Sequence, residues 1–248
     1  LVWFTIPESR GRPEPLDFPG LALVGIGLFG ITYGIVRGNE AGWTSMEVLT
    51  ALIGGVLILV SFIWWESRAA APLLPLRLFR NRSFSMANIV GFLFFFGIFG
   101  AIFILIQFLQ VVQGASPLEA GLMTMPWTLA PLVVSPLTGL LTSRIGTRPV
   151  IAVGMTLMSI GLFWSGAILD PSVEYIHFVP PFMAAGVGMG MVFAPIATAT
   201  LQGMAPEDRA TASGTNMTVR QIGIALGIAT LTAIFTALDG TLTPTGPQ

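Results

Sequence analysis

Seven long apolar segments divide this 248-residue sequence, and they constrain the fold more than any other feature. A helix that crosses the hydrocarbon core of a bilayer needs about 20 mostly apolar residues. Each segment reaches that length, and glycine or proline inside such a helix is tolerated. The segments cover residues 17–36, 46–65, 83–112, 117–142, 149–169, 178–201 and 213–238. The sequence therefore predicts an all-α membrane protein, a polytopic transmembrane helix bundle with about seven spans.

Composition supports a membrane protein and excludes several classes of function. Only 9% of the residues are charged, whereas soluble domains carry about 25%. The chain has no cysteine and one histidine. We expect no carboxylate inside a span either. Because these residues cannot form a catalytic triad or a metal cage, we predict that the chain is not an enzyme. Basic residues form no patch beyond those that set topology, so we expect no nucleic-acid partner.

Arginine positions predict the orientation of the spans. All eleven basic residues are arginines, and loops rich in lysine or arginine stay in the cytoplasm. Nine of them precede the first segment or lie in every second connection after it: Arg10, Arg12, Arg68, Arg77, Arg80, Arg82, Arg144, Arg148 and Arg209. The other connections contain only Arg37. We therefore expect a multi-pass protein of the plasma (cytoplasmic) membrane that enters its first span from the cytoplasm and ends outside.

The short connection GLLTSRIGTRPVI, from Gly139 to Ile151, carries two of these arginines. It resembles the loop motif of the major facilitator superfamily of secondary transporters, Gly-x-Leu-x-Asp-Arg-x-Gly-Arg-Arg/Lys-x-x-Leu. Ser143 replaces the aspartate of that motif, and Thr147 replaces its first basic residue. The matching positions are Gly139, Leu141, Arg144, Gly146 and Arg148. The resemblance implies a loop that latches neighbouring helices and gates the cytoplasmic side, and in this sequence Ser143 stands at the aspartate position of an ionic latch.

The alternative for this loop is a simpler role. Arg144 and Arg148 would then only set topology and interact with a helix C-terminus and with lipid phosphates. On either interpretation, Gly139 and Gly146 allow close packing and a tight turn.

Three further stretches resemble fourteen-span drug:proton antiporters: PLLPLRLFRNRSFSMAN, FLQVVQGASPLEAGLMTMP and ASGTNMTVRQIGIALGIA. The resemblance covers almost the whole chain and implies a helix bundle of the major facilitator type. It divides the chain into the end of a preceding span with a cytoplasmic loop (1–16), two extra central spans (17–65), a cytoplasmic amphipathic linker (66–82), a C-terminal bundle of five spans (83–238) and a polar tail (239–248). It also implies that the N-terminal half of the transporter and its last span are missing.

The linker at residues 66–82 reads ESRAAAPLLPLRLFRNR. We interpret it as an amphipathic helix that rests on the lipid surface, with its arginines facing the headgroups.

Candidate site residues fall on one face of the third span. At 100° per residue, seven amide and aromatic side chains share an arc of about 100°: Asn88, Phe92, Phe96, Phe99, Phe103, Gln107 and Gln110. Polar side chains are expensive in lipid, so this face should look into protein or a water-filled cavity. It either lines a site for an amphipathic substrate or packs helices together through amide hydrogen bonds.

Two other spans carry similar candidates. In the fourth span, Thr124, Trp127 and Thr128 share one arc near three prolines, which bend the span either as a gate or as a static kink. In the seventh span, Asn216 and Arg220 share an arc, and Arg220 is the only charge well inside a span. It either binds an anionic group or balances a carboxylate in the interior, or it snorkels to the cytoplasmic interface.

The resemblance implies proton-coupled efflux of drugs or other amphipathic small molecules by alternating access. The proton gradient would drive transport, and we expect no cofactor. The expected partners are the lipid bilayer, a small amphipathic substrate and the missing N-terminal half. Two alternatives stay open: an exporter of the same fold for one metabolite or lipid precursor, and a non-transporting membrane scaffold. The polar faces argue against the scaffold, because a scaffold needs no cavity lining.

Overall fold

The computed structural model describes residues 17–69, 72–170, 172–202 and 204–237, and these residues form helices and no strands. The main helices are α2 (Phe18–Ala41), α3 (Met46–Glu66), α4 (Arg82–Gln107), α5 (Pro117–Met123), α6 (Met125–Ile145), α7 (Thr147–Ala167), α8 (Val179–Leu201) and α9 (Arg209–Ala237). Seven helical segments of the described chain are long and apolar enough to cross a membrane. The predicted all-α bundle is therefore confirmed, while the expected segments 1–16 and 239–248 lie outside the described residues.

Polar side chains fix where several helices begin. Asp17 accepts a hydrogen bond from the Gly20 N–H and caps α2, and Ser45 accepts one from the Val48 N–H and caps α3. Asn81 caps α4 in the same way. Such caps satisfy N–H groups that have no partner within the helix. The predicted helix starts at the first three spans are accordingly correct to within a residue or so.

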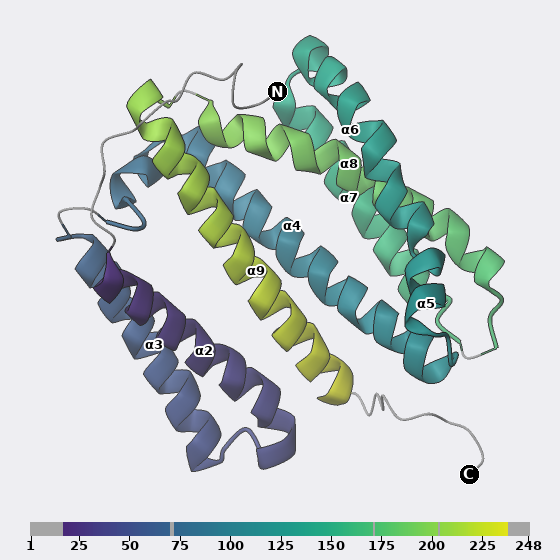
Figure 1. Cartoon of the computed structure of the whole chain (residues 1–248), viewed down its shortest axis with the longest axis horizontal. Coiled ribbons are helices and arrows are strands. Elements are labelled where there is room, and N and C mark those ends of the chain that lie inside the picture. Colours follow the sequence, from purple (N-terminus) through teal and green to yellow (C-terminus); the bar gives the residue numbers. More distant parts are fainter. Residues whose placement is uncertain (1–16, 70–71, 171, 203, 238–248) are drawn as a thin grey trace, which may run out of the picture.

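Two spans depart from a regular α-helix. Beyond Gln107, α4 continues as a five-residue π-helix, η2 (Phe108–Val112). The fourth span was expected to be continuous over 117–142, but α5 and α6 are separate helices that meet at Thr124. Pro126 lies in the first turn of α6, where the missing N–H costs nothing. Both irregularities fall toward the same end of the bundle (Figure 1).

The linker between α3 and α4 is not the surface helix that we expected. The described part contains only a 3-10 helix, η1 (Leu76–Arg80). Pro72 and Pro75 explain the difference, because proline removes a backbone donor and interrupts an α-helix. Leu78 is buried against a small cluster that includes Met204 and Ala212. The linker therefore packs, through Leu78, on the connection between α8 and α9.

Glycine lets the helices of the bundle approach closely. A Cβ atom at Gly223 would lie 2.8 Å from the Phe92 carbonyl oxygen, and one at Gly227 would overlap the Phe96 carbonyl oxygen. These contacts join α9 to α4. Gly186 on α8 contacts the backbone of α6 at Trp127 in the same way. Gly223 and Gly227 on α9, like Gly186 and Gly190 on α8, are small residues four positions apart, a spacing that lets membrane helices approach closely.

The connections that carry most arginines gather at one end of the molecule. In Figure 1 the start of α4, the junction of α6 and α7 and the start of α9 lie together, opposite the α2–α3 turn. An ion pair between Arg77 and Asp208, 2.6 Å between Nη2 and Oδ1, joins two of these connections directly. At the other end, hydrogen bonds from the Ser172 hydroxyl and N–H lower the pKa of Asp170, so that connection keeps a negative charge. The arginine-rich end is the end that the sequence analysis predicts to be cytoplasmic.

Candidate functional site

Arg220 is a half-buried residue of α9, and its side chain contacts rings of α4 and α8. It is eleven residues from the start of α9, or about 16 Å along the helix. Its guanidinium carbon lies 4.8 Å from the ring centroid of Phe95 on α4 and 6.0 Å from that of Phe193 on α8. Both distances allow attraction between the cation and an aromatic face. The guanidinium therefore sits among aromatic rings, which favours the interior interpretation of Arg220 over the snorkelling one.

No acid neutralises Arg220 within the part of the chain that the structure describes. The ion pairs found there are Arg37–Glu40, Arg37–Glu47 and Arg77–Asp208. The Arg220 Nε is buried and has no hydrogen-bond partner among the described residues. The Arg220 side chain is half-buried, and a charge partly removed from water without an acidic partner is costly, so this position is suited to an anionic group that comes from outside the described bundle.

An amide pair lies one helical turn from Arg220. The Asn216 Nδ2 on α9 donates to the Asn88 Oδ1 on α4 at 3.1 Å, and the Asn88 Nδ2 donates to the Phe84 carbonyl at 2.8 Å. Asn88 is only 2% exposed. A hydrogen bond between two helices satisfies amides that hydrocarbon could not. Three of the predicted site residues, Asn88, Asn216 and Arg220, are thus brought to the same α4–α9 interface.

The predicted aromatic face of α4 is divided between two environments. Phe92 and Phe96 lie on the α9 side, with ring centroids 6.0 Å apart. Phe99 instead lies beside Phe95 in a tilted arrangement, with ring centroids 5.9 Å apart, and so is a neighbour of a ring that contacts Arg220. Phe94, which the helical pattern placed on the opposite face, is fully buried against Phe193 and the rest of the core. Two sides of α4 are therefore packed against protein, one against α9 and the other against α8.

The outer part of the predicted face does not join this group. Phe103, Gln107 and Gln110 are half-buried and share no described contact with Arg220. Gln110 also lies in the π-helix η2, where the wider i→i+5 turn changes the direction in which a side chain points. The seven-residue face is therefore not a single surface.

The candidates of the fourth span lie elsewhere in the bundle. Trp127 is 1% exposed and packs against Phe182 of α8, with ring centroids 6.0 Å apart. The hydroxyls of Thr124 and Thr128 donate to carbonyls of their own helical turns. Trp127 thus has a packing role between α6 and α8, and the structure does not bring these three residues to Arg220.

The motif loop has a turn but no latch. Gly146 has φ +88°, a left-handed conformation that favours glycine, and it joins α6 to α7 as predicted. Nothing lies within 4 Å of a Cβ placed on Gly139, so the expected close packing there is not observed. The Ser143 hydroxyl donates to the Leu140 carbonyl of its own helix. Arg144 and Arg148 are exposed and form no ion pair with a described residue.

Sequence reasoning missed Phe95, Phe193 and Glu66. Helical periodicity along the sequence could not identify Phe95 and Phe193, because their role depends on which helices pack around Arg220. Glu66 was assigned to the linker, but it is the last residue of α3 and only 3% exposed. Its Oε2 accepts a hydrogen bond from the Leu74 N–H at 2.9 Å. The expectation of no carboxylate inside a span is therefore wrong at the end of α3. The sequence analysis ended this span at residue 65, after two tryptophans, but the helix includes Glu66.

Taken together, the fold and the α4–α9 interface define a multi-pass membrane protein whose helices hold amides, aromatic rings and one arginine at their contacts. Such an interior is typical of a transporter. The profile of the Major Facilitator Superfamily matches residues 18–228, and the chain belongs to that family. The expected major facilitator type is thus confirmed, and the family is one of transporters and not of enzymes.

Among similar proteins are three that are named for drug resistance or export. The multidrug resistance protein Stp of Mycobacterium tuberculosis is 31% identical over 234 residues, which are 94% of this chain and 43% of that protein. The multidrug transporter protein MdtP of Bacillus subtilis is 32% identical, over 95% of this chain and 44% of that protein. The multidrug export protein EmrB of Escherichia coli is 28% identical, over 92% and 45%. The chain thus spans less than half the length of these relatives.

Proposed function

We propose that this chain acts as the C-terminal part of a secondary transporter that exports drugs or other amphipathic small molecules across the plasma membrane. The observation that carries the proposal is Arg220, which lies beside the rings of Phe95 and Phe193 and has no acidic partner among the described residues, in a chain whose relatives are named for multidrug resistance or transport. A site with mostly apolar and aromatic walls and a few polar groups suits greasy cargo. Transport would require a second half that faces this bundle and alternates access around a shared site.

Each residue of the interior has a distinct part in this proposal. Phe95, Phe99 and Phe193 supply ring faces, and Arg220 supplies the charge that orients cargo or pairs with an acid. Asn88 and Asn216 hold α4 and α9 in register through their hydrogen bond. The π-helix η2 and the break at Thr124 supply places where the outer ends of α4 and α6 can bend, since π-helical turns often mark functional sites.

The proton gradient is the proposed source of energy. The described interior of α4 to α9 holds an arginine but no carboxylate near it, so the proton-carrying acid would come from the other half of the transporter. Protonation of that acid would release it from Arg220, because a neutral carboxyl no longer pairs with a guanidinium. Proton binding and cargo release would then be linked through one ion pair.

A narrow-substrate exporter of the same fold is the second candidate. The unpaired Arg220 is the observation in its favour, because a single interior cation suits one anionic metabolite as well as an acid of the protein. The two candidates differ in what is exported. Several unrelated compounds leaving the cell support the drug exporter, and a single anionic one supports the alternative.

Efflux measurements on the transporter that contains this chain test the proposal. Inverted membrane vesicles would be loaded with protons, and uptake of a panel of cationic, neutral and anionic compounds would be followed. We expect proton-driven uptake of several cationic and neutral compounds, and none when residues 1–248 are expressed alone. Proton-driven transport by the 248-residue chain alone would contradict the proposed need for a second half.

The orientation is tested separately. The sequence has no cysteine, so single cysteines at Ser143 and Ser172 report on their own loops. We expect an impermeant thiol reagent to label the Ser172 position in intact cells and the Ser143 position only after permeabilisation. The reverse labelling pattern would overturn the orientation.

A further inference from the structure

A bidentate ion pair fastens the linker between α3 and α4 to the connection between α8 and α9. The Arg77 Nη1 lies 3.0 Å from the Asp208 Oδ2, and the Arg77 Nη2 lies 2.6 Å from the Asp208 Oδ1. Asp208 ends a short 3-10 helix, η4 (Pro206–Asp208), directly before α9. Two parallel hydrogen bonds between a guanidinium and a carboxylate fix the orientation of both groups. The ion pair therefore sets how the linker sits on the start of α9 (Figure 1).

The residue after Arg77 buries an apolar side chain at the same place. Leu78 packs in a cluster with Phe84, Met204 and Ala212. Phe84 belongs to the first turn of α4 and Ala212 to the first turn of α9. Burial of Leu78 thus joins the linker to the starts of both helices, and the neighbouring ion pair holds Leu78 in that position.

The cluster is the first of three contacts along the α4–α9 interface. The hydrogen bond between Asn88 and Asn216 lies one helical turn further along both helices. Arg220 lies one more turn along α9, about 12 Å from Ala212. A shift at the start of α9 would therefore change the position of Arg220 relative to Phe95 on α4.

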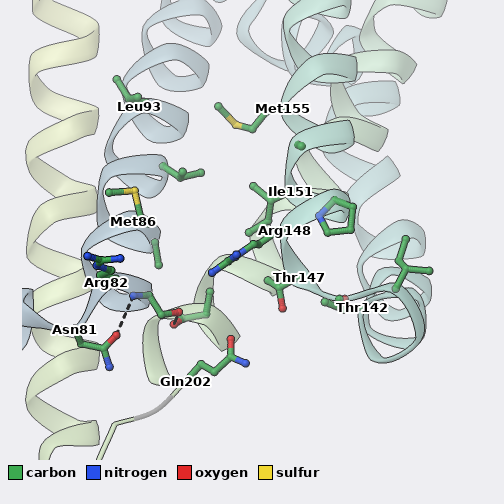
Figure 2. A pocket seen from close by; sticks show the side chains of 18 residues that line it. Asn81, Arg82, Met86, Leu93, Thr142, Thr147, Arg148, Ile151, Met155 and Gln202 are labelled. Carbon is green, nitrogen blue, oxygen red and sulfur yellow. Dashed lines mark hydrogen bonds between the residues drawn. The ribbon is translucent and has the colours of Figure 1, made fainter.

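The motif loop between α6 and α7 has no comparable fastening. Figure 2 shows Arg148 pointing from this loop toward the start of α4. The described side chains that line the hollow in front of it include no aspartate or glutamate. Among the ion pairs of the described residues, only Arg77–Asp208 joins two connections at the arginine-rich end.

We propose that the Arg77–Asp208 ion pair is a latch, which holds the starts of α4 and α9 together and opens during the transport cycle. Its role in transport rests on the proposed function, whereas the latch itself can be tested on the chain alone. The Arg77 side chain is 66% exposed, so water and salt screen the ion pair and it can break repeatedly. Once it opens, Leu78 leaves the cluster and α9 shifts against α4, a helix displacement of the kind that switches transporters between states.

Thiol labelling of the 248-residue chain measures how often the latch opens. The chain has no cysteine, so Met204→Cys places a single buried thiol in the cluster. A water-soluble reagent reaches that thiol only when the cluster opens. We expect Arg77→Gln and Asp208→Asn each to raise the labelling rate about fivefold, near the upper limit for an exposed ion pair. The charge-swapped variant Arg77→Asp/Asp208→Arg should restore slow labelling.

Two neighbouring residues supply matched controls. Arg80 is another exposed arginine of η1, and Glu207 is another exposed acid of η4. Neither forms an ion pair with a described residue, so Arg80→Gln and Glu207→Gln should leave the labelling rate unchanged. High salt should speed labelling of the chain with Arg77 but not of the Arg77→Gln variant. Equal labelling rates in the Arg77→Gln and Arg80→Gln variants would overturn the latch.

Crosslinking tests whether the latch opens during transport. In the transporter that contains this chain, freed of other cysteines, Arg77→Cys/Asp208→Cys would be bridged by a short bis-methanethiosulfonate, which a reducing agent cleaves. We expect the bridged form to lose most of its transport and the reduced form to regain it, because α9 cannot shift while the bridge is intact. Undiminished transport by the bridged form would overturn the opening step. Absence of transport by the transporter with its native residues would instead contradict the proposed function, and the labelling result would be unaffected.

Discussion

The α2–α3 pair and the bundle of α4 to α9 pack their helices by the same means. In the pair, a Cβ on Gly55 would lie 2.8 Å from the Gly27 carbonyl oxygen, and in the bundle one on Gly223 would lie equally close to the Phe92 carbonyl oxygen. The polar groups differ. In the pair they lie near the helix ends, as with Tyr33 and Glu47 or Trp65 and Asp17.

In the bundle, polar groups reach the middle of the helices. The Asn88–Asn216 hydrogen bond and Arg220 lie at the α4–α9 interface, where hydrocarbon would penalise them. Close glycine contacts suffice to assemble membrane helices, so they do not distinguish the two regions. The two regions differ in their interior polar groups. We infer that the bundle of α4 to α9 holds the transport site and that the α2–α3 pair supports the bundle through the α2–α9 contact.

The largest effect should come from separating α4 and α9. We expect Gly227→Ala to destabilise the folded protein by about 1–3 kcal/mol, because the new methyl group overlaps the Phe96 carbonyl and pushes the helices apart. Thermal unfolding in detergent, followed by tryptophan fluorescence, measures the change.

Gly214→Ala on the same helix is the matched control. Nothing lies within 4 Å of a Cβ at Gly214, so alanine there should be neutral or stabilising by up to about 1 kcal/mol. In the pair, Gly55→Ala and Gly54→Ala form the corresponding test and control. A bundle that loses its fold with Gly55→Ala would contradict the separation of the two regions.

The second prediction concerns Arg220. We expect Arg220→Ala to reduce transport by the complete transporter at least about tenfold, because about 1.4 kcal/mol of charge interaction would be lost. Arg220→Lys should retain part of the activity, since it keeps the charge but not the planar stacking on Phe95. Efflux normalised to membrane expression is the measurement. Wild-type transport by the alanine variant would show that the interior charge has no role.

Sequence predicted the parts of this comparison that depend on local pattern. Span lengths follow from apolar runs, and the Gly146 turn follows from a motif. The position of Arg220 on an interior face was also within reach, because a charge inside an apolar helix needs an environment other than lipid.

The remaining features depend on neighbours that periodicity does not reveal. A helical wheel assigns one inner and one outer face to each helix, but α4 is covered on two sides. Phe94 is therefore buried, although it lies on the side of α4 opposite the seven-residue face. Phe193 is on another helix from Arg220, and only the packing of α8 brings its ring near the guanidinium. The prediction of a helical linker failed for a different reason. It relied on the amphipathic pattern of residues 66–82 and gave too little weight to Pro72 and Pro75, which interrupt an α-helix.

The third prediction separates aromatic rings of the bundle from those of the pair. We expect Phe99→Ala to change the relative export of cationic compounds about fivefold, since a desolvated ring contact with a cation contributes roughly 1–2 kcal/mol. Phe96→Ala should have a smaller effect, because Phe96 lies on the α9 side and not beside Phe95. A resistance profile across several compounds, normalised to expression, is the measurement.

Phe29→Ala is the control for these variants. Phe29 lies on α2 and is 69% exposed, so its ring should not influence cargo selection. Phe94 is unsuitable as a control, because it is buried in the core. Identical profiles for the Phe99 and Phe29 variants would place the cargo site outside the rings around Arg220.

The smallest expected effect is the coupling between Asn88 and Asn216. Hydrogen bonds between membrane helices contribute only about 0.6 kcal/mol on average and about 1.7 kcal/mol at most, because amides in the unfolded state also find partners. A double-mutant cycle with Asn88→Leu, Asn216→Leu and the double variant isolates this interaction energy. We expect a coupling of about 0.5–1.5 kcal/mol in thermal or denaturant unfolding, with the Asn88 substitution the more harmful of the two because Asn88 also donates to the Phe84 carbonyl. In the pair, Asn39 donates to the Ala233 carbonyl across the α2–α9 contact, and Asn39→Leu should show no coupling to Asn88→Leu. Coupling between those two distant positions would mean that the α2–α3 pair and the bundle unfold as one unit. The two regions would then differ in their role in transport but not in their stability.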